Sequence, residues 1–326
     1  MRVAVIGIGA IGGLVSSMLC GRTDAEVLLH ARRHQVESFQ AGGLRLEIPA
    51  GLAIAGIPAG VLEIAADRLE LSVESEQPPR RWVGACELVL VCTKSGATHA
   101  AANVAALLLD EAGHCLSLQN GIGNEEILAG RLGLRRVLGA VITHGATRLG
   151  DGSVRWAGVG ELRFGPLPAS DVTKAGLQAI ASLFDEAGLN PVIVDDVRAQ
   201  IWSKLAINAA INPLAAICGV RNGALLEDEL FERASASMLE AVSVAHAEGT
   251  HLPDETEMIT YLREVLISTA DNRCSMLQDV MRGRVTETDS ISGEVIRRGE
   301  EMGVPTPVNV TLHALVQGIT RSQSLR

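Results

Sequence analysis

The stretch VAVIGIGAIGGLVSSML, residues 3–19, predicts a buried strand, a tight glycine turn and a helix in immediate succession. It contains a GxGxxG made by Gly7, Ile8, Gly9, Ala10, Ile11 and Gly12. One glycine permits the turn, one lets the backbone approach a pyrophosphate, and one allows close packing of helix on sheet. The helix start offers unpaired N–H groups and a partial positive charge to phosphates. We therefore expect a dinucleotide site; the alternative is a glycine-rich turn that binds nothing.

The sequence after this stretch continues to alternate apolar strands with helices. A helix is expected at residues 97–109, and further strands at residues 26–31, 86–94, 114–121 and 136–147. Continuous apolar strands alternating with helices are typical of a parallel sheet covered on both faces. We expect residues 153–166 to form an antiparallel hairpin that closes this unit. Residues 50–82, with scattered glycines and prolines, are expected to run over the surface, and we assign them no function.

After residue 195 the periodicity becomes helical almost to the end, with no convincing strand. The predicted fold class is α/β: an N-terminal Rossmann-type doubly wound sheet over residues 1–195, then an all-α C-terminal domain over residues 196–326. A chain of 326 residues is long enough for two such domains.

Composition excludes several classes of protein. A formal net charge of −10 argues against a nucleic-acid surface. The six cysteines and eight histidines show no metal-type spacing, so we expect no metal site. The N-terminal apolar run is broken by glycines, and we find no uninterrupted apolar run of the roughly 18–20 residues that a membrane span needs. Without a recognisable secretion signal, we expect a cytoplasmic protein and no membrane partner.

The end of the second strand indicates which dinucleotide binds. An NAD enzyme usually carries an acidic residue there, but Glu26 lies at the start of this strand and Arg32 and Arg33 follow its end. A guanidinium suits a 2′-phosphate, which favours NADP(H); the alternative is a solvated arginine pair. Lys94 and Asn120, at two other strand ends, are further candidates for the ligand site. Lys94 has a solvated lysine as its alternative, and Asn120 a turn former.

Three polar residues interrupt the apolar helix predicted around residues 201–218. Lys204, Asn208 and Asn212 recur at intervals of four, which places them on one stripe. Pro213 is expected to end or kink the helix beside Asn212, and Asn222 follows in a turn-like sequence. The stripe is compatible with a functional site, with a set of interhelix hydrogen bonds or with a solvated edge.

A second polar cluster lies in residues 271–289. Asn272 and Ser275 can share a helix face, and Glu287 follows Gly283. Glu287 is either an ordinary surface acid or a partner of Lys204. A carboxylate there would oppose the desolvation that lowers the pKa of a buried lysine.

Taken together, these segments resemble the ketopantoate reductase family over essentially the whole chain, from VIGIGAIG (residues 5–12) to TETD (residues 286–289). The form KLxxNxxINPLxA, which begins at Lys204, is the most specific part. The resemblance implies a 6-phosphogluconate dehydrogenase-like architecture. It also implies that residues 50–82 are longer than is usual for the family.

The resemblance further implies residue roles. Residues 7–12 would cradle the pyrophosphate, Arg32 and Lys94 would contact the 2′-phosphate of NADPH, and Asn120 and Ala146 would line the nicotinamide side. Lys204 resembles the family's general acid, and Glu287 completes the catalytic site. The substrate-binding residues would be Asn120, Asn208, Asn212, Asn222, Asn272 and Ser275.

By this resemblance the chain is an NADP-dependent oxidoreductase of the CH–OH class. It would reduce 2-dehydropantoate (ketopantoate) to (R)-pantoate in pantothenate (vitamin B5) biosynthesis. One alternative is a related NADPH-dependent reductase of another 2-oxo acid. Another is a non-catalytic NADP(H)-binding sensor, which would need the glycine loop but not Lys204 and Glu287. The alanine-rich helical region is compatible with a homodimer, although nothing in the sequence requires one.

Overall fold

The computed structural model of the chain describes residues 1–52, 56–168 and 170–323. Contacts within the chain divide it into two compact units. The first, called here the sheet unit, comprises residues 1–119 and 124–197. The second, the helical unit, comprises residues 120–123 and 198–326. The short segment 120–123 thus belongs with helices that lie far from it in sequence.

The sheet unit is built on an eight-stranded sheet whose order is β12-β11-β8-β7-β6-β1-β2-β5. From β5 to β8 all neighbours pair in parallel, whereas β11 is antiparallel to β8. The strands are β1 Arg2–Ile6, β2 Glu26–Ala31, β5 Glu70–Val73, β6 Cys86–Val91, β7 Leu109–Ser117, β8 Val137–Ile142, β11 Leu162–Pro166 and β12 Pro191–Ile193. This doubly wound order confirms the predicted α/β class.

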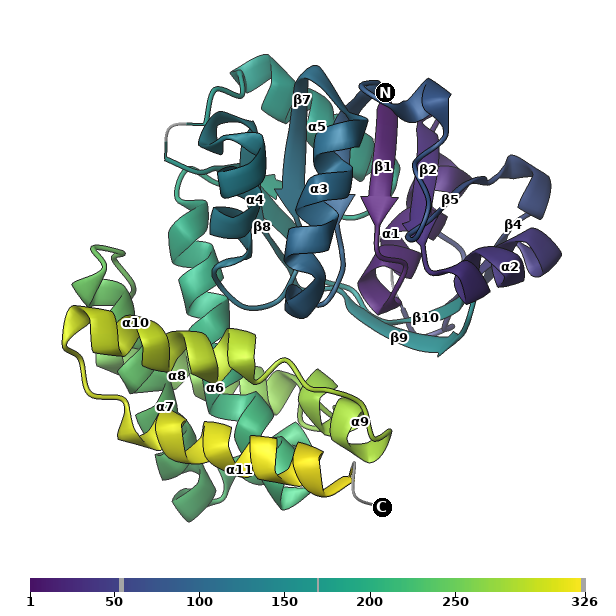
Figure 1. The fold of residues 1–326 in the computed structure, drawn as a ribbon. Coiled ribbons are helices and arrows are strands. Elements are labelled where there is room, and N and C mark those ends of the chain that lie inside the picture. Colours follow the sequence, from purple (N-terminus) through teal and green to yellow (C-terminus); the bar gives the residue numbers. More distant parts are fainter. Residues whose placement is uncertain (53–55, 169, 324–326) are drawn as a thin grey trace. The chain divides into compact units, whose positions relative to one another are not determined.

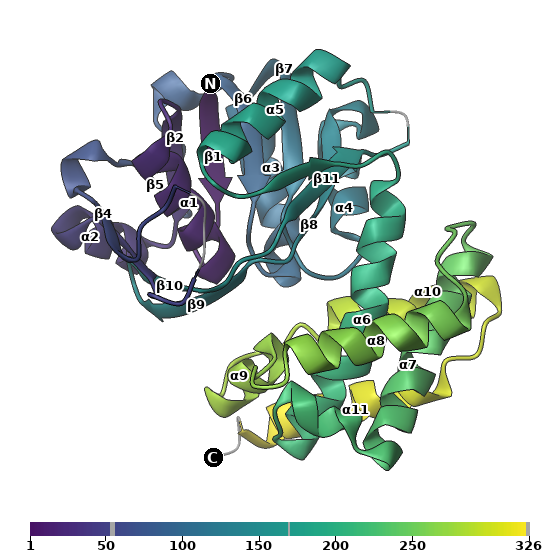
Figure 2. The same cartoon turned by 180° about the vertical axis from the view of Figure 1, so that it is seen from behind.

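Successive residues of the central strand supply two separate cores, because a strand sends alternate side chains to opposite faces. Val3 and Val5 of β1 pack with α1 (Ala10–Arg22) and α5 (Lys174–Glu186). Ala4 and Ile6 pack with α3 (Thr98–Leu108) and α4 (Asn124–Leu132). Figure 1 shows α3 and α4 in front of the sheet, and Figure 2 shows α5 on the opposite face. A strand buried on both faces must be apolar throughout, which is why residues 3–6 carry no polar residue.

A second, four-stranded sheet corrects the predicted hairpin at residues 153–166. β10 (Ser153–Gly158) pairs antiparallel with β9 (Gly145–Gly150), whereas β11 joins the large sheet. The hairpin is therefore β9–β10. β10 also pairs with β3 (Leu44–Ile48), which pairs with β4 (Gly60–Ile64). The alternation of apolar residues reveals which residues form strands, but not which strands pair with each other. The apolar side chains of β10 pack in the same core as α1.

Residues 50–82 contribute more than a surface excursion, which corrects our expectation. They contain β4 of the small sheet and β5 at the edge of the large one. Ile57, Ile64 and Trp82 are buried. The part of this segment at residues 53–55 lies outside the described residues.

The helical unit surrounds α6 (Val197–Cys218), as both views show (Figures 1 and 2). Trp202, Leu205, Ala206, Ala209 and Ala210 of α6 are each at most 1% exposed. The other helices are α7 Asp228–Ala247, α8 Glu255–Ser268, α9 Ser275–Met281, α10 Glu294–Met302 and α11 Pro307–Gln323. By length and composition α6 is apolar enough to cross a membrane, but 72% of its most apolar window is buried, as in the core helix of a folded domain.

We expected Pro213 to end or kink the helix beside Asn212. The first alternative is wrong, because α6 continues through Pro213 to Cys218. A proline inside a helix removes the N–H that would bond to the carbonyl four residues earlier. That carbonyl belongs to Ala209, and it accepts a hydrogen bond of 3.0 Å from the buried Ser237 hydroxyl of α7. A neighbouring helix thus replaces the donor that proline lacks, which lets the helix continue.

We expect Ser237→Ala to lower the free energy of unfolding by about 1–3 kcal/mol, because it leaves the Ala209 carbonyl buried without this donor. Urea titration of the folded chain measures this loss. Ser243→Ala is the matched control on the same helix, since the exposed Ser243 hydroxyl bonds to the carbonyl of Leu239 within α7. Equal stability of the two variants would contradict the role given to Ser237.

Candidate active site

The glycine loop joins β1 to α1 and is as tight as its sequence predicts. Gly7 has a φ of 93°, and a Cβ there would lie 2.6 Å from Cγ2 of Thr93. A Cβ on Gly12 would collide with the carbonyl oxygen of Gly7. A larger residue at Gly7 would therefore collide with the segment after β6, and one at Gly12 would push α1 away from the glycine loop.

Gly9 differs from its neighbours, because a Cβ there would meet no described atom within 4 Å. Gly9 also caps α1, which receives no side-chain cap from any described residue and has no acid in its first turn. The first N–H groups of a helix lack partners within it. This open, uncapped helix start fits the pyrophosphate of a dinucleotide.

Two contacts from the β2 side hold the loop in place. The Gly7 N–H donates to the carbonyl of His30, at 3.0 Å, and the Gln35 side chain in α2 (Arg33–Gly42) donates to the carbonyl of Ile8, at 2.7 Å. Gln35 was not among the residues singled out from the sequence. Its only signal in the sequence is its place two residues after HARR, since its burial is seen only in the structure.

The other cofactor candidates of the sheet unit lie at strand ends or on the small sheet. Arg32 directly follows β2 and caps α2, and Lys94 lies after the end of β6; both side chains are exposed. Ala146 is partly buried on β9, opposite Trp156 of β10. Arg32 and Lys94 therefore follow the carboxyl ends of parallel strands, where ligands bind in sheets of this type.

In the helical unit, Asn120 joins Lys204 to Glu287. The Lys204 ammonium donates to Oδ1 of Asn120 at 3.1 Å. The Asn120 amide nitrogen donates to Oε2 of Glu287 at 3.3 Å. The carboxamide thus presents its oxygen to the cation and its N–H to the anion, which is the orientation that satisfies both groups.

This environment changes the acidity of Lys204. Burial lowers the pKa of its ammonium from 10.5 to about 8, and the negative charge of Glu287 acts in the opposite direction. A lysine with a pKa near 8 is still mostly protonated at neutral pH and gives up its proton more readily than an ordinary lysine. Such a group suits general acid catalysis.

If Lys204 acts as a general acid, kcat/KM should fall as the pH rises through about 8, because its ammonium then loses its proton. Glu287→Gln removes the charge that raises this pKa, so the alkaline limb should move to lower pH. Rates measured from pH 6 to 10 test both statements. Glu186→Gln, at an exposed position ending α5, is the control. An alkaline limb that stays in place in Glu287→Gln would contradict the assignment.

A π-helical turn, η6 (Asp289–Gly293), holds Glu287 and Asn120 near each other. The Ser290 hydroxyl donates to the carbonyl of Glu287 at 3.1 Å. The carbonyl of Ser290 lies so close to Gly121 that a Cβ on this glycine would collide with it. Gly121 has a φ of 89°, a conformation that favours glycine. Ser290 was not predicted from the sequence, since a π turn leaves no clear pattern.

The remaining substrate candidates lie in two pairs of segments tied together by hydrogen bonds. Asn208 is partly buried on α6, and Asn212, 6% exposed, offers its carbonyl to the thiol of Cys274 at 3.7 Å. Cys274 caps α9, whose first residue is the exposed Ser275. The structure thereby brings Ser275 to the end of the asparagine stripe. Cys274 was not singled out from the sequence, where it is one of six cysteines without metal-type spacing.

Asn222 and Asn272 form the second pair. The backbone N–H of Asn222 donates to the carbonyl of Asn272 at 3.0 Å, and its side-chain nitrogen donates to the hydroxyl of Thr269 at 2.9 Å. Oδ1 of Asn222 is buried and has no hydrogen-bond partner among the described residues. The Asn272 side chain is exposed, and it precedes α9 instead of sharing its face with Ser275.

Both residues that flank segment 120–123 are anchored in the sheet unit. The Gln119 side chain donates to the carbonyl of Thr93, at 3.1 Å, and to the hydroxyl of Thr98, at 2.9 Å. That hydroxyl also lies 2.8 Å from Oδ1 of Asn124. These contacts fix the points at which the chain leaves the sheet unit and returns to it. These hydrogen bonds were not predicted from the sequence, because each joins residues at least 21 positions apart.

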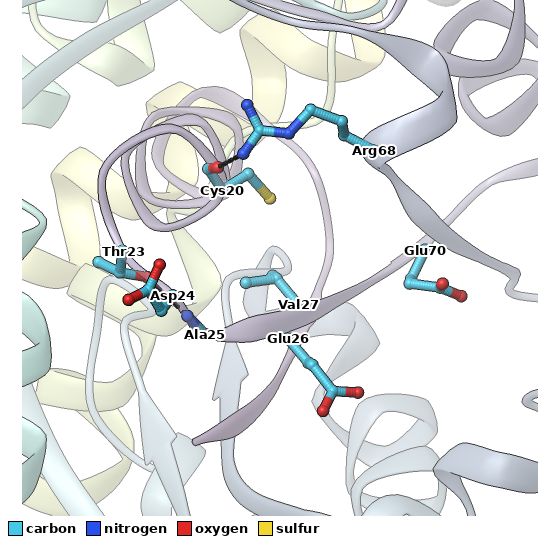
Figure 3. Close-up of a pocket in the computed structure, with 8 residues that line it drawn as sticks. All are labelled: Cys20, Thr23, Asp24, Ala25, Glu26, Val27, Arg68 and Glu70. Atoms are coloured by element: carbon cyan, nitrogen blue, oxygen red, sulfur yellow. Dashed lines mark hydrogen bonds between the residues drawn. The ribbon is translucent and has the colours of Figure 1, made fainter.

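The structure also carries a pocket at the opposite end of β2, shown in Figure 3. Glu26 begins β2 and lines it, and Arg68 donates there to the carbonyl of Cys20 at 3.2 Å. Burial raises the pKa of the Cys20 thiol to about 12, so it is no nucleophile. The other lining residues are Thr23, Asp24, Ala25, Val27 and Glu70. Because ligands of doubly wound sheets bind at the carboxyl ends of the strands, this pocket is not the candidate site.

Comparison with known proteins places these features in a family. Residues 3–169 match the family model described as ketopantoate reductase PanE/ApbA, and residues 196–320 match its C-terminal counterpart. A 2-dehydropantoate 2-reductase of Archaeoglobus fulgidus is 34% identical over 319 residues, which cover 98% of this chain and 97% of the relative.

Two solved structures share the whole fold. A PanE/ApbA family ketopantoate reductase from Ralstonia eutropha JMP134 is 33% identical, with a TM-score of 0.84, and the match covers 99% of this chain and 100% of that one. D-mandelate dehydrogenase in a ternary structure with NADH and anilino(oxo)acetate is 25% identical, with a TM-score of 0.87 and the same coverage. The chain therefore belongs to the ketopantoate reductase family of nicotinamide-dependent oxidoreductases.

Proposed function

We propose that this protein reduces 2-dehydropantoate to (R)-pantoate with NADPH, on the route to pantothenate in the cytoplasm. The observation that carries the proposal is the group formed by Lys204, Asn120 and Glu287. A protein that only binds the cofactor has no need for a partly buried, charge-stabilised lysine. Residues 1–195 would form the NADP-binding domain and residues 196–326 the substrate-binding and catalytic domain.

The cofactor would be held by the glycine loop and the exposed cations beside it. The uncapped start of α1 suits the pyrophosphate, and Arg32 and Lys94 supply positive charge for a 2′-phosphate. When bound, NADPH supplies a hydride for the C2 carbonyl carbon of the substrate.

Lys204 would complete the reduction. As the carbonyl becomes an alkoxide, its oxygen gains negative charge that the ammonium stabilises and then neutralises by giving up a proton. Asn120 fixes the position of the ammonium, and Glu287 keeps it protonated before reaction. Hydride and proton together convert the ketone to the alcohol, and Lys204 regains its proton from solvent.

The substrate would be held by the asparagines and Ser275. Carboxamide and hydroxyl groups bind a carboxylate and a hydroxyl through hydrogen bonds without adding charge. Asn212 and Asn222 are buried enough for these bonds to be selective, since an analogue that lacks the matching group would leave a buried polar atom unpaired.

Reduction of a different 2-oxo acid is the second candidate, because D-mandelate dehydrogenase shares the fold over nearly the full chain. NADPH oxidation with a panel of 2-oxo acids, from 2-dehydropantoate to phenylglyoxylate, decides between the two. We expect the highest kcat/KM with 2-dehydropantoate. An equal or higher value for an acid without its hydroxyl would refute the proposed substrate.

A further inference from the structure

Two carboxylates lie opposite the arginines expected to recognise the 2′-phosphate. β5 pairs in parallel with β2, and Ala31 stands in register with Val73. The next residues along the two strands are Arg32 and Glu74, so both strands end at the same edge. The Glu74 N–H donates to the carbonyl of Ala31 at 2.8 Å, which extends this pairing beyond the strands.

The side chains meet across this edge. Nε of Arg32 lies 3.9 Å from Oε2 of Glu74, and Nη2 of Arg33 donates to Oε1 of Glu76 at 2.6 Å. The N–H of Glu76 donates to the carbonyl of Val73 at 2.9 Å, so a turn presents both carboxylates on the same side. Both pairs are solvent-exposed, with Arg32 69% and Glu74 42% exposed. Exposed ion pairs are weak, and an incoming ligand can separate them.

The residue after the second strand normally selects the cofactor in this fold. A carboxylate there accepts from the ribose 2′-hydroxyl of NAD, whereas an arginine accommodates the 2′-phosphate of NADP. This chain offers both groups at one place, the arginine from β2 and the carboxylate from the neighbouring strand end. Each carboxylate repels a 2′-phosphate and draws a guanidinium away from it.

We propose that Glu74 and Glu76 set the cofactor preference and allow the enzyme to use NADH as well as NADPH. Glu74 accepts a hydrogen bond from the 2′-hydroxyl of NADH, while the two carboxylates together weaken the binding of the 2′-phosphate of NADPH. This inference rests on the proposed function for one point only, that the adenosine ribose lies beside Arg32.

Cofactor binding without substrate tests the proposal independently of catalysis. Titration calorimetry measures the Kd values of NADPH and NADH for the wild-type chain and for the double variant Glu74→Gln, Glu76→Gln. Removing both negative charges should tighten NADPH binding by roughly 2–30-fold, the range expected for two exposed charge pairs. Glu74→Ala, which also loses the acceptor oxygen, should weaken NADH binding by a similar factor.

Glu63→Gln is the matched control, because Glu63 on β4 is an exposed partner of another arginine, Arg45, at 3.7 Å. It should leave both Kd values unchanged. A ratio of the NADPH and NADH Kd values that stays constant in the double variant overturns the proposal. So does a wild-type chain that fails to bind NADH.

Arg32→Ala separates this inference from the proposed function. If Arg32→Ala weakens NADPH binding while the glutamate variants leave the ratio unchanged, the roles of Glu74 and Glu76 are wrong and the cofactor site stands. If Arg32→Ala leaves NADPH binding unchanged, the 2′-phosphate does not lie at Arg32, and both the inference and the proposed NADPH contact fail.

Discussion

Lys204→Ala is expected to lower kcat by about 10²–10⁴-fold, the range that a positioned general acid contributes. In the proposed mechanism, the variant removes the group that neutralises the growing charge on the carbonyl oxygen. It also leaves Asn120 without the donor that it accepts from, and Glu287 without the positive charge that it stabilises. Cofactor binding should persist, since the glycine loop and Arg32 belong to the sheet unit. Turnover with saturating substrate and cofactor titration measure the two effects separately.

Lys174→Ala is the control for this variant, because Lys174 is an exposed lysine in the first turn of α5. It should retain wild-type turnover. Near-normal turnover in Lys204→Ala would remove Lys204 from the mechanism. A loss of NADPH binding equal to the loss of kcat would show instead that the residue supports the cofactor.

Gly121→Ala is expected to lower kcat by about 100-fold, although Gly121 has no reactive group. The alanine must adopt a φ of 89°, and its Cβ would collide with the carbonyl of Ser290. Either the segment or the π turn must move, and with it Asn120 or Glu287. A displacement of about 1 Å at such a site can cost about 10² in rate.

Gly133→Ala separates backbone strain from displacement. Gly133 has a φ of 85°, but a Cβ there would meet no described atom within 4 Å. Gly133 has a ψ of 139° and so lies in another region of positive φ that L residues rarely adopt. Both variants should therefore lose about 1–3 kcal/mol of stability, the cost of holding alanine in a sparsely populated backbone conformation, and Gly133→Ala should keep its kcat. Equal activity of the two variants would show that the packing of Gly121 on Ser290 does not position the site.

Much of the fold follows from patterns that act within one segment. The glycine loop, the buried strands of the parallel sheet and the apolar helix around Lys204 are local in this sense, and their residue types specify them. The partner of β10 was predicted wrongly. The apolar side chains of β10 pack in the same core as α1, and this long-range packing cannot be inferred from one segment alone. The expected helix end at Pro213 was wrong for the same reason. The hydroxyl that bonds to the carbonyl of Ala209, in place of the missing proline N–H, comes from another helix.

The candidate site was likewise predictable only where its residues lie within one segment. Helical spacing placed Lys204, Asn208 and Asn212 on one stripe but left its role open, and Glu287 was either a surface acid or a partner of Lys204. Only the resemblance to the family chose between these alternatives. The bridge through Asn120 did not follow, because it joins residues separated by 84 and 167 positions. Glu74 and Glu76 were invisible in a segment that shows no clear periodicity. Only the register of β5 against β2 reveals that they face the arginines.

The four residues from Asn120 to Gly123 have a consequence for how such proteins can be recombined. They group with the helices, although both flanking residues belong to the sheet unit. A single crossover near residue 196 would join the helices of one relative to the Asn120 segment of another. Such a chimera would keep its Lys204 and Glu287 but receive a segment shaped for a different π turn. Exchange of whole helical domains should therefore preserve activity only when residues 120–123 are exchanged with them.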